Sequence, residues 1–320
     1  MNKTQSKKMK YYLKFFFNYR FLIKSINIMI ILLTFGNSFN NKIFDNNFDY
    51  VHYENDIITE KIIKDSDWLL ELNHAYLING LIRKHKPKSC LEIGVGNGGS
   101  SVLILNAIKD FSESSLVSID LYTWKNKTKK LGYIVEEKFP ELTNKWKLFL
   151  GNMSSKILSK LNLKYDFLFL DSAHVTPGEY FNIIEVLPFL KENAIIVLHD
   201  IVWHFYKILK TDIQSNQLIH PTQINLMSTL IGKKILLKSN TNTLLNIGAV
   251  FLDKNQKKYY LNYFLLLLNV WSYMPTDKQL EDLREFIIKY YNNSLFLRIY
   301  DNAVDFNKRI FKKLNKKEIK

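Results

Sequence analysis

The stretch Ser89-Cys-Leu-Glu-Ile-Gly-Val-Gly-Asn-Gly-Gly-Ser-Ser101 decides the fold. Its first part, residues 90–93, is a short apolar run that suits a buried β-strand. The apolar run at residues 102–108 suits a helix. Between the two runs stand four glycines, Gly94, Gly96, Gly98 and Gly99. Strand, glycine turn and helix in this order predict a nucleotide-binding loop, because glycine lets the backbone approach a ligand closely and a helix N-terminus offers unpaired N–H groups.

The loop does not identify its ligand. Gly94, Gly96 and Gly99 satisfy the pattern G-x-G-x-x-G, which dinucleotide-binding folds share with other doubly wound folds. A tight strand-to-helix turn without any ligand is the other interpretation. The rest of the chain must therefore decide between them.

The bulk composition is that of a globular protein with a substantial core. The chain has 320 residues, of which 47% are hydrophobic and 14% aromatic. Its single cysteine, Cys90, excludes an internal disulfide and a cysteine-based zinc site. A cysteine inside a predicted buried strand is most simply a core residue. We therefore expect a reducing, cytoplasmic setting.

The net charge of +15 belongs to the two ends of the chain. Residues 1–44 hold eight Lys or Arg and no acid, and residues 308–320 hold seven and one acid, which together give +14. The body between them is close to neutral, so we do not expect a nucleic-acid groove on the folded domain. Basic ends are more typical of solvated segments or of contact with anionic lipid.

Residues 1–47 are predicted to form a separate basic and aromatic extension that ends in an asparagine-rich linker. Their apolar run, residues 26–35, is shorter than the roughly 20 residues that a bilayer crossing needs. It also lacks the small-residue cleavage site of a signal peptide. A leftover signal-like segment and a poorly ordered extension remain alternatives, but we favour an interfacial helix at the inner membrane surface.

Apolar runs then alternate between strand-like and helix-like patterns. Strands are predicted at 89–93, 116–120, 146–150, 165–170 and 194–198, helices at 68–82, 154–161, 177–190, 259–271 and 280–291, and an antiparallel hairpin at 235–237 and 247–252. Residues 65–67 are expected to cap the first of these helices. This order predicts an α/β fold with a doubly wound, mostly parallel, seven-stranded Rossmann-like sheet, an antiparallel edge hairpin and C-terminal helices. We expect a nucleotide-binding domain at 48–255 and a helical extension with a basic tail at 256–320, whose aromatic residues could pack in a homo-oligomer.

Polar residues follow the predicted strands where a doubly wound sheet binds its ligand. The glycine turn, Asp120, Asn152, Asp171 and Asp200 all lie at the carboxyl ends of the predicted strands. Asp120 lies 21 residues after Gly99, where an acid binds ribose hydroxyls in such folds; a helix cap is the simpler alternative. Because these five features, the glycine turn and four polar residues, coincide at one edge, we predict a site there.

Taken together, these parts resemble the class I S-adenosylmethionine-dependent methyltransferase family. The matching pieces are L-E-I-G-V-G-N-G-G-S-S (91–101), V-S-I-D (117–120), D-F-L-F-L-D-S-A-H (166–174) and I-I-V-L-H-D (195–200). The hairpin resembles the reversed last strand of that family. The resemblance covers residues 66–253 and leaves both ends unexplained. It implies that the domain expected at 48–255 is an S-adenosylmethionine-binding methyltransferase domain.

The resemblance implies roles for particular residues. Gly94, Gly96 and Gly98 would pass the methionine part of S-adenosylmethionine, and Glu92 would hold the loop and the amino end of the cofactor. Asp120 would bind both ribose hydroxyls, and Asn152 would lie near adenine. An acid in the position of Asp171 is common at the methyl-transfer centre.

Two histidines beside strand-end acids are the candidate bases. His174 lies three residues after Asp171, and His199 directly precedes Asp200. A sulfonium methyl group needs little activation, whereas a hydroxyl acceptor must lose a proton, so we predict O-methylation of a sugar or another small-molecule hydroxyl. Asp171 and Asp200 could instead hold Mg²⁺, as in similar O-methyltransferases, although His199 stands where some of these carry an acid.

Two other functions stay open at this stage. A nicotinamide-dependent oxidoreductase shares the glycine spacing and Asp120, but the chain has no Tyr-x-x-x-Lys pair in a convincing place. A non-catalytic binding module could keep the fold without the chemistry. The acceptor pocket is expected around Trp203, His204, a loop at 215–229 and the C-terminal helices.

Overall fold

The computed structural model describes residues 57–65, 70–123, 128–202, 222–238 and 244–318. The predicted N-terminal extension, Trp203 and His204 lie outside these residues. None of the helices in the described part of the chain combines the length and apolar character that a bilayer crossing requires.

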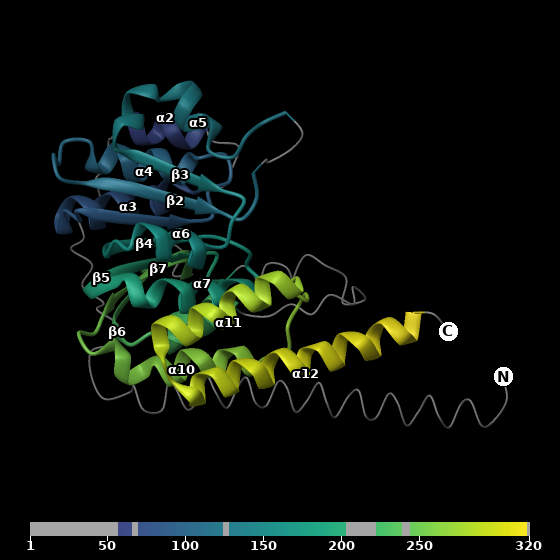
Figure 1. Ribbon diagram of the computed structural model, residues 1–320. Helices are drawn as coiled ribbons and strands as arrows, with labels where there is room; N and C mark the ends of the chain where they lie inside the picture. The colour runs from purple at the N-terminus through teal and green to yellow at the C-terminus, as the bar shows by residue number, and fades with distance from the viewer. Residues whose placement is uncertain (1–56, 66–69, 124–127, 203–221, 239–243, 319–320) are drawn as a thin grey trace. The chain divides into compact units, whose positions relative to one another are not determined.

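Seven strands of the described residues form one mixed sheet, as predicted. Their order is β3-β2-β1-β4-β5-β7-β6, with β1 to β5 parallel and β7 antiparallel to both β5 and β6 (Figure 1). The bounds are β1 Ser89–Ile93, β2 Ser115–Asp120, β3 Trp146–Leu150, β4 Tyr165–Leu170, β5 Leu190–His199, β6 Gly232–Lys238 and β7 Leu244–Leu252. The all-parallel order 3-2-1-4-5-6 of dinucleotide-binding folds has no reversed strand in this place.

The central strands are buried on both faces, which explains their continuous apolar runs. Along β4, Phe167 and Phe169 join one hydrophobic cluster and Leu168 and Leu170 the other. The same alternation in β5 places Ile195 and Val197 in the first cluster. His199 lies two residues after Val197, so its side chain is on the same face of the sheet.

Helices cover both faces of the sheet (Figure 1). Helices α2 Ile57–Asp65, α3 Leu72–His85, α4 Gly99–Ile108 and α5 Tyr133–Lys138 contribute to the first cluster. The second cluster contains residues of α6 Ser154–Leu161, α7 Gly178–Val186, α9 Thr222–Thr229, α10 Tyr260–Leu265, α11 Asp277–Tyr291 and α12 Ser294–Glu318. The C-terminal helices therefore share a core with one face of the sheet.

Several predicted boundaries are wrong. Asp65, expected to cap the helix before β1, ends α2 instead, and α3 begins only at Leu72. The helix expected to reach Leu190 ends at Val186, where a 3₁₀ turn containing Pro188 leads into β5, because proline lacks the N–H that continues a helix.

The C-terminal part also differs from the prediction. The helix expected at 259–271 is the shorter α10 with 3₁₀ turns before and after it. Residues 222–229, expected in a loop, form α9, and residues 308–318 of the basic tail continue α12. Basic side chains do not prevent a helix whose other face packs against a core.

Candidate active site

The glycine loop joins β1 to α4 and lies directly against the end of β4. Gly94 has a φ of 89°, and a Cβ built on it would stand 1.9 Å from the carbonyl oxygen of Asp171. Only glycine fits this position, because both the left-handed backbone and the backbone contact exclude a side chain. Gly94 and Gly96 are partly exposed, whereas Val95, Asn97 and Gly98 are buried. The open surface of the loop is therefore backbone.

Glu92 supports this loop through hydrogen bonds from its buried side. Its carboxylate is fully buried and accepts hydrogen bonds of 2.6 Å from Ser100, Ser101 and Ser118. Burial raises the pKa of Glu92 to about 7, although the three hydroxyls oppose this shift. The bonds tie β1 to the first turn of α4 and to β2. Both carboxylate oxygens are engaged, so in this geometry Glu92 supports the loop and does not face a ligand.

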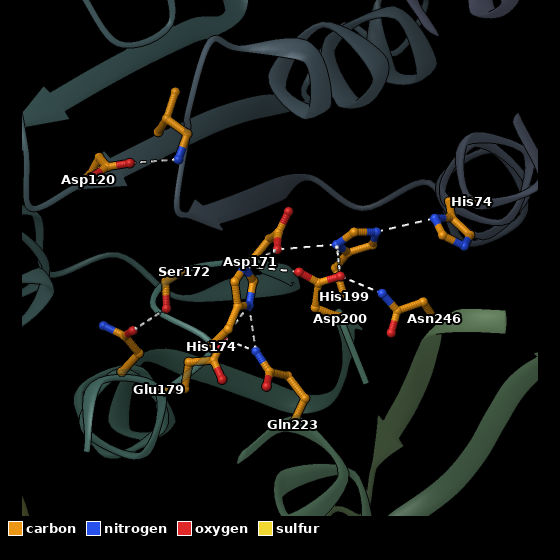
Figure 2. Close-up of polar contacts among 12 residues, drawn as sticks. His74, Asp120, Asp171, Ser172, His174, Glu179, His199, Asp200, Gln223 and Asn246 are labelled. Atoms are coloured by element: carbon orange, nitrogen blue, oxygen red, sulfur yellow. Dashed lines mark hydrogen bonds and ion pairs between the residues drawn. The ribbon is translucent and has the colours of Figure 1, made fainter. Parts of the chain in front are cut away.

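Asp120 lies at the end of β2 beside the loop (Figure 2). Its Oδ2 accepts from the N–H of Val95 at 2.9 Å, and its Oδ1 accepts from the N–H of Tyr122 at 3.1 Å. A carboxylate has about four lone-pair positions, so each oxygen can accept one bond more. Asn152 is exposed beyond the end of β3, next to Gly151, which bonds to the Asp120 carbonyl.

The ends of β4 and β5 bring three charged side chains together. Nε2 of His174 lies 3.1 Å from Oδ2 of Asp200 and 3.4 Å from Oδ1 of Asp171. One ligand atom from each of the three residues lies within 4.8 Å of those from the other two. Figure 2 shows their side chains converging in the centre of the site. The predicted pair Asp171 and Asp200 is therefore joined by one of the two predicted bases.

A buried carboxylate stands on the other side of the His174 ring. Nδ1 of His174 lies 3.3 Å from Oε1 of Glu179 and 2.7 Å from Nε2 of Gln223, which also donates to Glu179. Burial alone would lower the pKa of His174, but Glu179, Asp171 and Asp200 outweigh it and raise the pKa to about 9. Burial raises the pKa of Glu179, against the effect of His174.

His199 has a different environment from His174. Its side chain is 9% exposed, against 22% for His174. Nδ1 of His199 lies 3.2 Å from Oδ1 of Asp171, and Nε2 lies 3.2 Å from Nδ1 of His74. Both ring nitrogens are thus engaged inside the protein. Only His174 of the two predicted bases presents an appreciable surface to a substrate.

The charges of the cluster stabilise one another. Burial would raise the pKa of Asp171, but His199, with His174 and His74, holds it below its usual value. Burial opposes protonation of His199, but Asp171 and then Asp200 raise its pKa. Burial raises the pKa of Asp200, against the effect of both histidines.

The backbone supports the same residues in an uncommon conformation. His174 and Asp200 have φ values of 52° and 57°, in the left-handed region. Only a few per cent of residues other than glycine have a positive φ, with Asn, Asp and His the most frequent among them, and such residues concentrate at functional sites. The side chain of Asn246 in β7 donates to Asp200 and accepts from the N–H of Val202 at 2.7 Å, so the reversed strand fixes this turn.

The sequence did not identify four members of the site: His74, Glu179, Gln223 and Asn246. One signal was available, since His74 falls on the apolar stripe of the predicted helix, four residues after Leu70 and four before Ile78. Glu179 was indistinguishable from an acid that favours a helix N-terminus. Gln223 and Asn246 carried no signal at all, because they approach the site only through tertiary contacts.

The geometry can now be compared with known proteins. Residues 91–201 match the family model described as a methyltransferase domain. The matched segment begins in β1 and ends just after β5, so it contains the glycine loop, Asp120, Asp171, His174 and Asp200. No curated protein sequence matches the chain.

Solved structures of similar fold include two O-methyltransferases. The enzyme from Bacillus cereus, in complex with SAH, is 14% identical with a TM-score of 0.46 over 63% of this chain and 93% of that chain. TomG from Streptomyces achromogenes, involved in tomaymycin synthesis and in complex with SAM, is 16% identical with a TM-score of 0.43 over 61% and 86%. At such values the likeness says nothing about the substrate.

Proposed function

We propose that this chain, whose residues 91–201 match the methyltransferase domain model, is an S-adenosylmethionine-dependent methyltransferase of the class I type that methylates a hydroxyl group of a small acceptor, with a sugar as the first candidate. One observation carries the proposal. An open glycine loop with a strand-end acid adjoins, through the contact of Gly94 with Asp171, a cluster in which His174 meets Asp171 and Asp200. A cofactor half and a proton-transfer half thus share one edge of the sheet.

The residues of the cofactor half fit S-adenosylmethionine. The accessible part of the loop is the backbone of Gly94 and Gly96, which suits the amino-acid end of the cofactor. Asp120 keeps acceptor capacity on both oxygens, as two neighbouring ribose hydroxyls require. The exposed Asn152 at the next strand end remains our candidate for contact with adenine. When bound, the cofactor supplies an activated methyl group, so the protein must position the acceptor and remove its proton.

His174 is our candidate for the base. In this assignment Nδ1 of His174 carries the hydrogen and points it to the fully buried Glu179, which orients the ring and leaves Nε2 to take up the acceptor proton. The amide of Gln223, 2.7 Å from Nδ1, would then present its oxygen to that N–H in place of its NH₂ group. Asp171 and Asp200 lie within 3.4 Å of Nε2 and stabilise the imidazolium that forms. This is the arrangement of a general base held by a buried carboxylate. His199, engaged on both nitrogens, holds Asp171 in place.

A divalent cation is the second candidate for activating the acceptor. Asp171, His174 and Asp200 form a group that could hold one, and Glu179 would then orient the histidine ligand. A nitrogen ligand favours a transition metal such as Zn²⁺ or Fe²⁺ over Mg²⁺, which prefers oxygen ligands. The two uses of Nε2 exclude each other, because a nitrogen that binds a metal cannot accept a proton. Dialysis against a chelator separates them: turnover that survives supports the base.

The first experiment is calorimetric titration with S-adenosylmethionine and, separately, with NAD, on the wild type and on Asp120→Ala. We expect S-adenosylmethionine to bind and the variant to bind it more weakly. Preference for NAD would support the oxidoreductase, and binding of neither would support a non-catalytic module. An acceptor screen by mass spectrometry follows, over sugars, phenols and amines, where a mass gain of one methyl group identifies the product.

Two proposals concern the rest of the chain. Residues 1–47 would contact anionic lipid, which vesicle flotation with and without these residues tests; equal flotation contradicts it. The C-terminal helices would support a homo-oligomer, since Leu261, Leu265, Leu268 and Ile288 are 37% to 46% exposed. Light scattering of the purified protein measures that state directly.

A further inference from the structure

His74 is a buried histidine that the proposed reaction does not use. It lies in the first turn of α3, on the opposite side of His199 from Asp171 (Figure 2). Its side chain is 2% exposed, and its Nδ1 lies 3.2 Å from Nε2 of His199. The two rings meet edge to face, with centroids 5.1 Å apart and planes at 75°. A polar group so deeply buried needs a partner, and His199 is the partner that its Nδ1 has.

The contact with His74 holds the ring of His199 at Nε2, the nitrogen that faces away from Asp171. A carboxylate without a proton only accepts hydrogen bonds, so Nδ1 of His199 must donate to Asp171. If the ring turned over about its long axis, a carbon atom would face Asp171, and Nε2 would also leave His74. The two contacts therefore select one orientation of His199 together.

Other charged groups do not replace this contact. Within the part of the chain that the structure describes, the acid that pairs with His74 is Glu71, whose carboxylate lies 4.0 Å from Nε2 on a side chain that is 63% exposed. Burial lowers the pKa of His74 to about 3, with His199 acting in the same direction and Asp171 opposing it. A neutral His74 keeps an acceptor nitrogen available for a protonated His199.

We propose that His74 is a positioning residue whose Nδ1 holds the ring of His199 in the orientation that presents Nδ1–H to Asp171. The acid at the methyl-transfer centre would thus be aligned by a chain of two histidines that begins on a helix outside the matched domain segment. This inference rests on the proposed function, since it gives Asp171 its place beside the acceptor. The orientation of His199 itself can be measured without any turnover.

The test compares three variants of the full chain. His74→Leu removes the polar contact and keeps an apolar group of similar size. His74→Asn keeps a polar atom close to the position of Nδ1. His85→Leu is the control, because His85 is an exposed histidine at the other end of the same helix. Its ring lies 5.2 Å from that of Phe251, which is not part of the site. Proton–nitrogen NMR with labelled histidine resolves the ring nitrogens of the seven histidines, and His199→Gln assigns the signals of His199.

The expected result is specific to His199. His74→Leu should change the nitrogen shifts of His199 and lower kcat by about 10- to 100-fold, by analogy with the loss of a hydrogen-bond partner behind a metal-ligating histidine, while the Kd for S-adenosylmethionine stays within about threefold. His74→Asn should recover most of the kcat, and His85→Leu should match the wild type. Unchanged His199 shifts in a folded His74→Leu, or equal losses in the Leu and Asn variants, would overturn the proposal.

The two proposals fail in distinguishable ways. A wild type that methylates no acceptor contradicts the proposed function, while the NMR comparison still decides whether His74 orients His199. If His74→Leu does not fold, the His74→Asn variant decides: wild-type shifts of His199 support the proposal, and shifts that differ from the wild type refute it.

Discussion

Replacing Gly94 by alanine tests the contact on which both halves of the site depend. The new Cβ would stand 1.9 Å from the carbonyl oxygen of Asp171, 2.6 Å from its carbon and 3.0 Å from Cα of Ser172. These are backbone atoms, so no side-chain rotation can relieve the overlap. Either the loop or the end of β4 must move.

The loss of stability can be worked out from the contacts. A φ of 89° costs a residue other than glycine about 1–2 kcal/mol. The forced movement also strains two hydrogen bonds of 3.0 Å, from Gly94 N–H to the Ile119 carbonyl and from Asp171 N–H to the Ile93 carbonyl. Each contributes about 1 kcal/mol, so the total loss is about 3–4 kcal/mol. For a domain of this size that lowers Tm by about 6–16 °C.

Gly151→Ala is the matched control, because Gly151 also has a left-handed φ, of 78°. Among the described residues, the one atom close to its new Cβ is Cγ2 of Thr123, at 3.0 Å, on an exposed side chain that can turn away. We expect a loss of about 1–2 kcal/mol from the backbone alone. Calorimetric unfolding of both variants measures the difference in stability, and titration with S-adenosylmethionine measures whether the loop still binds the cofactor. Equal losses in the two variants, or unchanged cofactor affinity in Gly94→Ala, would refute the reasoning.

Three other predictions concern single side chains. Asp120→Asn should weaken S-adenosylmethionine binding by about 10- to 100-fold in calorimetry, because the charged acceptor is lost while the shape is kept; an unchanged Kd contradicts its role. The folded-state pKa of Glu92, about 7, lies above its usual 4.5, so the protein loses about 3 kcal/mol of stability as pH rises from 4.5 through 7. Unfolding curves against pH should show this fall in the wild type and not in Glu92→Gln. Because a base must be neutral and the pKa of His174 is raised to about 9, kcat/KM should rise with pH up to about 9; a flat profile, or one that His174→Ala leaves in place, argues against His174.

The sheet was predictable because its signals are local. Each central strand contains a short apolar run bounded by turn residues, as in Tyr165–Leu170, and the predicted and observed bounds of that strand agree. The reversed hairpin followed from the short separation of its two runs. Helix ends were harder to predict, since Asp65 suits both the end of one helix and the cap of the next. Tertiary packing decides between such choices.

The site was predictable only up to the ends of the strands. Parallel strands place their carboxyl ends on one edge, so Asp120, Asp171 and Asp200 had to lie near the glycine loop. The sequence could not separate the roles of His174 and His199, because both adjoin a strand-end acid. Burial separates them: one faces Glu179 and keeps an open surface, and the other is enclosed by His74.

The sequence by itself determined the succession of strands along the chain, the glycine loop and the set of acids at the strand ends, because these depend on residue type and on neighbours along the chain. Only the tertiary structure decided which side chains become partners. Glu179 comes from a helix start, Asn246 from the reversed strand and His74 from a helix 125 residues before His199. Contacts over such separations depend on how helices pack on the sheet, which no local pattern of residues encodes.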